Sequence, residues 1–110
     1  MTVARPWGSW RVVFDTEYFK VKYMCIDKGQ RLSLQRHKNR SESWIVVKGH
    51  PVVVKGKHRI SLNPEDSIYI PKGEIHRIEA PHDAVRIIEV QHGSCDENDI
   101  ERLEDDYERE

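Results

Sequence analysis

The 110-residue sequence has few cysteines, no long hydrophobic run and no excess of either charge. Two cysteines cannot form a disulfide framework, and Cys25 lies among apolar residues, where a small buried thiol and a reducing compartment are expected. The longest apolar runs are about four residues, far short of the roughly 20 that a membrane-spanning helix needs. The first residues also lack a signal peptide's apolar stretch. We therefore expect a cytoplasmic protein with no membrane partner.

The charges of the chain almost cancel, because 18 side chains are basic and 19 are acidic. A general nucleic-acid surface needs a basic excess, so no nucleic-acid partner is expected, and an anionic ligand must be held by local cations. The length fits one domain. We divide it into an N-terminal arm (1–10), a barrel (11–93) and an acidic tail (94–110).

Short apolar or alternating segments recur along the chain, and turn-forming residues separate them. About nine strands with no helix between them indicate an all-β sandwich or barrel. Only the tail has helical spacing, at Ile100, Leu103 and Tyr107, and its charge predicts a surface helix or an ordered arm. The predicted strands cover residues 10–14, 19–26, 31–37, 43–47, 51–54, 58–62, 67–70, 75–80 and 85–90.

Two segments contain residues that can bind a metal ion. In a strand, Ser33, Gln35 and His37 project from one face, so Gln35 and His37 can share one ligand. We predict that the chain then returns as an antiparallel strand and brings Glu42 beside His37 across the ladder. Further on, a proline–glycine turn delivers His76 into the next strand as a fourth ligand.

The predicted shell offers one amide oxygen, two imidazoles and one carboxylate. This set suits one divalent ion, zinc before Mn, Co, Ni or Fe, and it lacks the sulfur of structural thiolate sites. The remaining histidines are expected to be solvated, namely His50, His58, His82 and His92.

The spacing of these residues resembles the two signature motifs of the cupin superfamily, with glutamine in place of the first histidine. The resemblance implies a double-stranded β-helix, or jelly-roll barrel, with the metal inside. An apo cupin that uses the same residues structurally is the alternative. As they stand in this sequence, the motifs are Gly29-x5-Gln35-x-His37-x4-Glu42-x6-Gly49 and Pro71-x-Gly73-x-x-His76.

Segments 5–10, 19–49, 67–81 and 87–93 resemble the cupin domain of type II mannose-6-phosphate isomerases, which is often fused behind a mannose-1-phosphate guanylyltransferase. In that family a Gln, His, Glu, His shell is expected, which accounts for Gln35. An amide oxygen makes the site harder than an imidazole would, so one-electron oxygen chemistry, and with it a cupin dioxygenase, is disfavoured.

The sequence departs from that family's pattern in two places. No glycine-rich nucleotide loop opens the chain, so isomerase activity without guanylyltransferase activity is expected. The tail reads GSCDENDI where the family tends to have an aromatic residue and a glycine, and it ends in YERE. Contacts of the tail with a substrate or a second subunit are therefore left open.

The resemblance implies interconversion of mannose 6-phosphate and fructose 6-phosphate through a cis-enediol, with a metal to polarise the carbonyl and a base to carry the proton. Arg40, between the metal-bearing strands, and Lys22 are the candidate phosphate ligands, and the resemblance favours Arg40 for a role in turnover. A solvated loop arginine is the alternative for Arg40.

Ser33 and Glu89 complete the candidate site. Ser33 shares the ligand face, where it can bind the substrate or fill a narrow barrel end. Glu89 shares a strand face with Ile87 and Gln91, and burial would raise the pKa of its carboxyl toward that of a general base. An exposed edge glutamate explains the same pattern.

The segment RPWGSW (5–10) is expected to pack over the barrel or across to a second subunit, or to be a plain N-terminal strand. Apolar strand faces on both sides of the barrel favour a homodimer. A second functional hypothesis is a non-catalytic metal cupin that binds a sugar phosphate or nucleotide sugar as a regulator or partner, because binding and isomerisation need the same shell.

Overall fold

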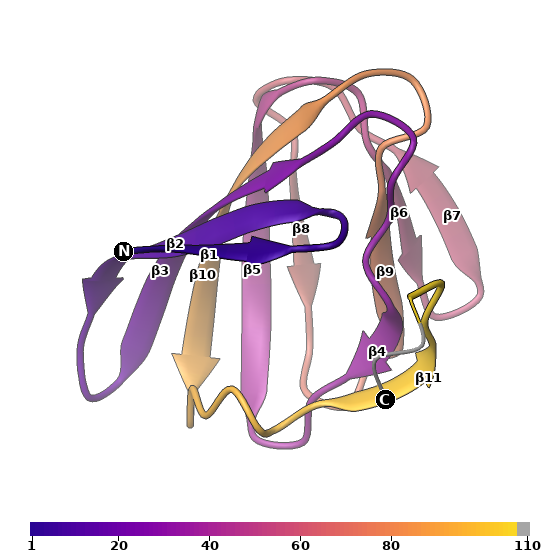
Figure 1. Ribbon diagram of the computed structural model, residues 1–110. Helices are drawn as coiled ribbons and strands as arrows, with labels where there is room; N and C mark the ends of the chain where they lie inside the picture. The colour runs from indigo at the N-terminus through magenta and orange to yellow at the C-terminus, as the bar shows by residue number, and fades with distance from the viewer. Residues whose placement is uncertain (108–110) are drawn as a thin grey trace.

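The computed structural model describes residues 1–107, and all regular structure in this range is β. Two antiparallel sheets face each other across a common interior (Figure 1). This arrangement confirms the predicted all-β jelly-roll barrel. The first sheet has the order β1 (Thr2–Arg5), β2 (Gly8–Asp15), β3 (Phe19–Ile26), β10 (Val85–Gly93), β5 (Arg40–Lys48) and β8 (Ser67–Ile70), and the second has the order β11 (Glu101–Glu104), β4 (Leu34–Arg36), β9 (His76–Glu79), β6 (Val52–Lys55) and β7 (His58–Ser61).

Each strand predicted from the sequence overlaps one of these strands, and β1 and β11 were not predicted. The surface helix considered for the tail is wrong, since residues 101–104 form β11, which pairs with β4. Without this pairing, one edge of the short strand β4 would expose unpaired backbone groups, and such an edge favours strand addition over a separate helix. Residues 94–107 of the tail therefore form an ordered arm. Within residues 1–107, no helix long and apolar enough to cross a membrane occurs.

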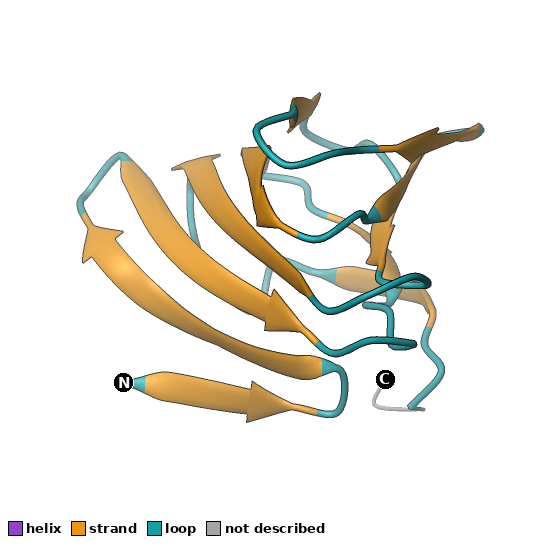
Figure 2. Cartoon of the chain, turned by 90° about the horizontal axis from the view of Figure 1, so that it is seen from above, coloured by secondary structure: helices purple, strands orange, loops and turns teal. Residues whose placement is uncertain are grey.

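The interior of the barrel is divided into an apolar half and a polar half. On β10, the buried residue Ile87 is followed by the buried residues Glu89 and Gln91, and on β5 buried Val46 gives way to buried Glu42 in the opposite chain direction. Each large apolar side chain in the first half contributes roughly 1.5–3 kcal/mol of burial free energy. The second half gathers the polar side chains that the barrel shields from water. Seen from above, the strands of the two sheets stand on either side of this interior (Figure 2).

The N-terminal segment 5–10 packs over its own barrel. Trp7 joins the hydrophobic core at 4% exposure, and its carbonyl accepts a hydrogen bond from the backbone N–H of Asp27. Gly8 makes this close approach possible, because a Cβ atom at this position would lie 2.0 Å from the carbonyl oxygen of Cys25. Cys25 itself is half-buried and free, and not fully buried as expected, because it alternates with the inward residues Met24 and Ile26.

Candidate metal centre

The polar half of the interior brings the candidate ligands together from both sheets. Gln35 on β4 lies opposite His76 on β9 in the five-stranded sheet. Glu42 on β5 lies opposite Gln91 on β10 in the six-stranded sheet. His37 follows β4 directly, where the chain crosses from one sheet to the other. The two predicted motifs therefore meet inside the barrel.

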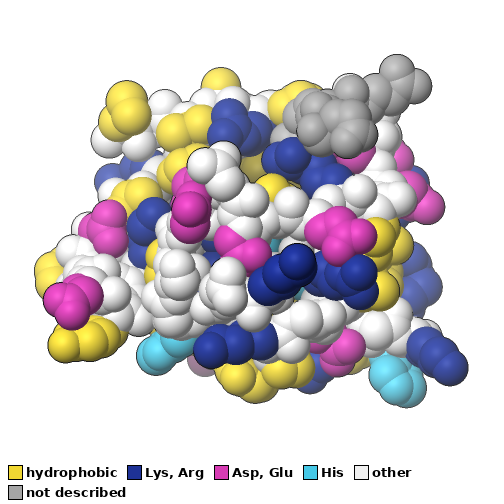
Figure 3. Space-filling view, turned by 90° about the horizontal axis from the view of Figure 1, so that it is seen from below, with side chains coloured by type: hydrophobic (Ala, Val, Ile, Leu, Met, Phe, Trp, Pro, Cys, Tyr) yellow, Lys and Arg dark blue, Asp and Glu magenta, His cyan; other side chains and the backbone are white. Residues whose placement is uncertain are grey.

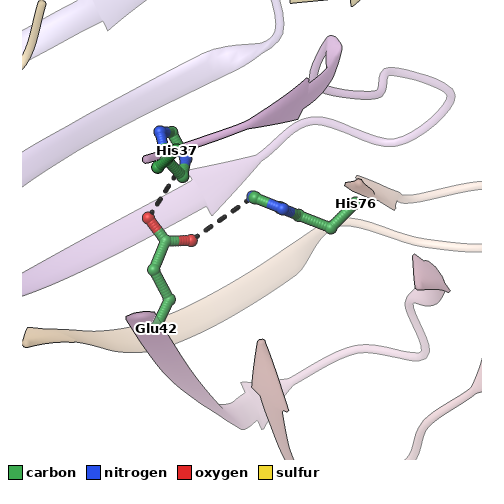
Figure 4. A group of neighbouring side chains, drawn as sticks. All are labelled: His37, Glu42 and His76. Atoms are coloured by element: carbon green, nitrogen blue, oxygen red, sulfur yellow. Dashed lines mark ion pairs between the residues drawn. The ribbon is translucent and has the colours of Figure 1, made fainter. Parts of the chain in front are cut away.

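Glu42 approaches His37 across the barrel interior and not along a shared ladder. The predicted antiparallel pairing is wrong, because β4 and β5 belong to different sheets and the connection between them is a corner of the barrel. The predicted proximity is nevertheless present. Nε2 of His37 lies 3.3 Å from Oε2 of Glu42, and Nε2 of His76 lies 3.5 Å from Oε1, so the carboxylate sits between the two rings (Figure 4).

Backbone carbonyls orient both imidazole rings. Nδ1 of His37 lies 2.6 Å from the carbonyl oxygen of Asp99, and Nδ1 of His76 lies 2.8 Å from that of Glu74. A carbonyl oxygen only accepts, so Nδ1 carries the hydrogen in both rings. Nε2 then faces the carboxylate, which is the arrangement that second-sphere hydrogen bonds impose on metal-binding histidines.

These contacts require a positive charge between the rings and the carboxylate. A neutral ring with its hydrogen on Nδ1 presents a lone pair at Nε2, and each oxygen of Glu42 also presents lone pairs. All three side chains are at most 3% exposed, so water does not separate them. At His37 the guanidinium of Arg40 supplies this charge, since Nη2 lies 3.3 Å from Nε2 of His37 and Nε donates to Oε2 of Glu42. Between His76 and Glu42, an additional proton or a metal ion makes the contact favourable.

The pKa values of the three side chains follow from burial and from this contact. Burial lowers the pKa of His37, and the charge of Arg40 adds to the effect. Burial also disfavours charge on His76, but its hydrogen bond and attraction to Glu42 raise its pKa. Burial alone would raise the pKa of Glu42, whereas the hydrogen bond from His76 and the nearby charges lower it to about 2. The carboxylate is therefore ionised near neutral pH.

The donor set fits a divalent metal ion. One ligand atom each from His37, Glu42 and His76 lie within 4.8 Å of one another, and Gln35 lines the same cavity. Two imidazole nitrogens, a carboxylate and an amide oxygen match the preferences of zinc and its divalent neighbours.

Arg40 lies inside the site and not on a solvated loop. Its side chain is 6% exposed, and it opens β5 at the corner of the barrel. Nε donates a hydrogen bond to Oε2 of Glu42 at 3.0 Å, and Nη1 donates to the carbonyl oxygen of Asp96 at 3.3 Å. Arg40 thus connects the candidate metal centre with the tail.

Glu89 is a buried carboxyl in the same cavity. Its strand, β10, lies between β3 and β5, so the exposed edge position considered for Glu89 is wrong. Nε1 of Trp44 donates a hydrogen bond to one carboxyl oxygen at 2.9 Å, and Nε2 of Gln91 donates to the other at 2.7 Å. Burial and the negative charge of Glu42 raise the pKa of Glu89 to about 7, a value suited to a general base or acid.

Lys22 and Ser33 also line this cavity. Nζ of Lys22 lies 3.8 Å from the ring centroid of Trp10 and 2.6 Å from Oε2 of Glu97. Ser33 is 1% exposed, and its hydroxyl has no hydrogen-bond partner among the described residues. This leaves both readings of Ser33, a substrate contact or a space-filling residue, compatible with its position.

The candidate residues surround a single cavity of about 110 Å³. Except for His76, each predicted site residue lines it, whereas His50, His58, His82 and His92 are exposed as expected. The sequence analysis missed several cavity residues as site members, among them Trp10, Trp44, Gln91 and Glu97. Gln91 shares the inward face of β10 with Glu89, which is a signal that was available. The approach of Glu97 from the tail had no such signal.

The two facing antiparallel sheets give the chain a cupin fold. Rru_A2000 from Rhodospirillum rubrum, whose structure is described as a cupin-2 domain, is similar with a TM-score of 0.79 and 20% identity, covering 90% of this chain and 77% of that chain. Residues 1–105 match the family described as "Mannose-6-phosphate isomerase C-terminal". The chain belongs to this family.

Two curated relatives are similar over nearly the whole chain. The alginate biosynthesis protein AlgA of Pseudomonas aeruginosa is 46% identical over 109 residues, which is 97% of this chain and 23% of that protein. The mannose-1-phosphate guanylyltransferase ManC of Salmonella typhimurium is 39% identical over 110 residues, which is again 97% of this chain and 23% of that protein. The chain thus spans about a quarter of the length of these relatives.

Proposed function

We propose that this domain is a metal-dependent isomerase that interconverts mannose 6-phosphate and fructose 6-phosphate in the cytoplasm. The observation that carries the proposal is the presence of Glu89, a buried carboxyl with a pKa of about 7, in the same cavity as the His, Glu, His centre. A binding site alone has no need of a buried proton carrier. Membership of the isomerase C-terminal family supports the same activity.

Gln35, His37, Glu42 and His76 would hold one divalent ion, with zinc as our first choice, and the ion would polarise the substrate carbonyl when bound. Two of the ligands are held ready for this role. The carbonyl oxygens behind both histidine rings fix Nε2 toward the cavity interior. Arg40 holds Oε2 of Glu42, so the carboxylate cannot rotate away from the rings.

Glu89 is the proton carrier in this proposal. In the forward direction its carboxylate takes the proton from C2 of mannose 6-phosphate and returns it to C1, while the hydroxyl proton moves from the oxygen on C2 to the oxygen on C1. The substrate passes through a cis-enediol and no atom is gained or lost. Trp44 and Gln91 keep both carboxyl oxygens in place during this transfer. Arg40 provides positive charge beside the developing oxyanion.

Metal content is the first test. Protein purified without any chelator should contain about one divalent ion per chain. The metal content should fall as the pH drops through about 6.5, where free imidazole titrates. His37→Ala and His76→Ala should each abolish binding, whereas His58→Ala, on an exposed part of β7, should not. Equal behaviour of all three variants would refute the ligand assignment.

The second test is turnover. Metal-loaded protein incubated with mannose 6-phosphate should form fructose 6-phosphate, and mannose without its phosphate should be a very poor substrate. A metal-loaded protein that binds sugar phosphates in calorimetry but isomerises none of them would instead be the non-catalytic cupin.

A further inference from the structure

The buried ammonium group of Lys22 lines the same cavity as the candidate metal centre. Only 6% of the Lys22 side chain is exposed, and Nζ lies over the ring of Trp10 at 3.8 Å from its centroid. A cation in such a place needs an anionic partner, since an aromatic face compensates only part of the lost hydration. Glu97 supplies that partner at 2.6 Å.

Glu97 comes from the tail and lies at the mouth of the cavity. It stands between β10 and β11, and 45% of its side chain is exposed. Nζ of Lys20 lies 3.5 Å from the same carboxyl oxygen. The hydrogen bond from Lys22 and the charges of Lys22, Arg40 and Lys20 outweigh burial and lower the pKa of Glu97. The carboxylate is thus held by cations on the cavity side and is open to water on the other.

Both Lys20 and Lys22 form their ion pair with the same carboxylate, that of Glu97. Asp15 lies opposite Lys20 in the strand register, but its carboxylate forms no ion pair with Lys20 among the described residues. Arg40 is paired with Glu42 and belongs to the metal centre. Glu89 lies opposite Lys22 in the strand register, but burial raises its pKa and its two oxygens accept from Trp44 and Gln91. Two ammonium groups therefore share one carboxylate, and a doubly charged anion would match them better.

We propose that Lys22 and Lys20, with Trp10 beneath Lys22, form the phosphate subsite, and that Glu97 occupies it as an internal anion that the substrate's phosphate displaces. This inference rests on the proposed function in one respect, namely that the ligand is a phosphorylated sugar. Lysine suits the exchange, because an ammonium group is a point charge that accepts carboxylate or phosphate without a fixed geometry.

The surrounding contacts allow the Glu97 side chain to leave without movement of the backbone. On one side of Glu97, the carbonyl oxygen of Asp96 accepts from Arg40, and on the other, the carbonyl oxygen of Asp99 accepts from His37. These bonds hold the tail segment in place. The exposed side chain itself has room to turn into solvent, so displacement requires only rotation about its side-chain bonds.

The test is calorimetry with metal-loaded protein and three probes: mannitol 6-phosphate, which has no carbonyl and cannot isomerise, inorganic phosphate, and mannitol. Glu97→Gln should bind both phosphates about three- to tenfold more tightly, because the competing charge is gone, and should bind mannitol as the parent does. Lys22→Met should weaken both phosphates at least about tenfold. Glu101→Gln, the same change at a surface pair with Arg36, should change nothing.

A second measurement needs no variant. In the parent, a carbon-detected NMR titration should find the pKa of the Glu97 carboxyl below its ordinary value, and saturation with mannitol 6-phosphate should return it toward that value. Unchanged or weaker phosphate binding by Glu97→Gln, or an unmoved pKa of Glu97 at saturation, would overturn the subsite.

Failure of the subsite and failure of the isomerase assignment have different signatures. If the parent isomerises mannose 6-phosphate but Glu97→Gln binds phosphates with the parent's affinity, the subsite is rejected and the isomerase assignment stands. If Glu97→Gln binds phosphates more tightly but the parent shows no turnover, the isomerase assignment is rejected and the subsite stands. A parent that binds neither phosphate overturns both.

Discussion

Glu89 is the base in the proposed reaction, and its burial also lowers the free energy of unfolding when the carboxyl is ionised. Its carboxyl is buried beside the negative charge of Glu42, and both of its oxygens accept hydrogen bonds. A surface glutamate would be more stable in its ionised form but would be a weaker base near neutral pH. Two predictions at the residue scale follow from this position.

Glu89→Gln should lower turnover of mannose 6-phosphate by about a hundredfold or more, since an amide cannot carry the proton. Metal content should match that of the parent, because Glu89 is not among the proposed ligands and the amide has nearly the same size. Steady-state kinetics and metal analysis on the same samples measure both quantities. Turnover within a factor of a few of the parent's would remove Glu89 from its role.

The same substitution should stabilise the metal-free protein at high pH. The folded-state pKa of Glu89, about 7, lies above the ordinary value of 4.5, so ionising this group destabilises the fold. The loss develops as the pH rises from 4.5 to 7 and amounts to at most about 3 kcal/mol. Urea unfolding in chelator should therefore show Glu89→Gln to be more stable than the parent at pH 8 and nearly equal to it at pH 4. An equal difference at both values would argue for a packing effect.

Arg40 has a different kind of role, because it contacts the carboxylate of the metal centre directly. Arg40→Ala should lower the turnover of metal-saturated protein by roughly a hundredfold, as a charge-assisted contact in a dry site contributes several kcal/mol. Arg40→Lys should recover only part of this, because it lacks the guanidinium fork. The assay is run at saturating metal because Arg40 also orients Glu42. Full activity of the lysine variant would show that charge alone suffices.

At the element scale, the strands were predictable and their partners were not. Alternation in segments such as 19–26 and 85–90 reports which side chains are buried, and burial is a local property of a strand. Pairing depends on contacts between distant segments. For this reason Glu42 could be predicted beside His37, whereas the crossing from β4 in one sheet to β5 in the other could not.

The tail shows the same limitation more strongly. Its apolar spacing indicated a helix, but the open edge of β4 determines its conformation, and β4 lies about 65 residues earlier in the chain. Nothing within residues 94–107 reveals that edge. The arm then carries three contacts of the site: the carbonyl behind His37, the carbonyl that accepts from Arg40, and the carboxylate at Lys22. Part of the site was therefore invisible for the same reason as β11.

A substitution in the tail should consequently weaken metal binding without touching a ligand. The carboxylate of Asp99 accepts hydrogen bonds from the backbone N–H groups of Lys38 and Asn39, and its carbonyl oxygen orients His37. Asp99→Ala should raise the metal dissociation constant about tenfold, in the range seen for second-sphere substitutions. Competition with a chromogenic chelator measures this, and Glu101→Ala in the same segment serves as the matched control. Equal affinities of the two variants would contradict the role of the tail.

At the scale of the whole molecule, the six-stranded sheet has an apolar outer face. Tyr69 on β8 and Ile45 and Val47 on β5 are 54%, 43% and 51% exposed. The N-terminal segment is not free to bind a second subunit through Trp7, which is buried in its own core. We propose that self-association uses this outer face. The space-filling view from below shows a different surface, on which Lys, Arg, Asp and Glu are interspersed (Figure 3).

We expect a homodimer that buries on the order of 1,500 Å² through this face. Light scattering at tens of micromolar should give twice the chain mass, and Val47→Glu should give a monomer with parental metal content. Ser61→Glu, on the exposed side of β7 in the other sheet, should leave the dimer intact. A monomeric parent would reject the dimer.

Deletion of residues 1–10 should lower both stability and activity, because Trp7 and Trp10 line the cavity.

The division of the barrel interior has a consequence for laboratory evolution. On β5 and β10, a core residue and a site residue lie two positions apart on the same inward face. Trp44 and Glu42 form this pair on β5, and Ile87 and Glu89 form it on β10. A one-residue shift of either strand would turn both the core residue and the site residue toward solvent. Insertions in these strands should therefore abolish folding and activity together, and selection for activity should remove them. Substitutions elsewhere in the apolar half have no such coupling, whereas Trp44 does, because its Nε1 donates to Glu89. Libraries restricted to the apolar half can tune heat tolerance while the polar half is kept constant, and new substrates can be sought in the reverse way.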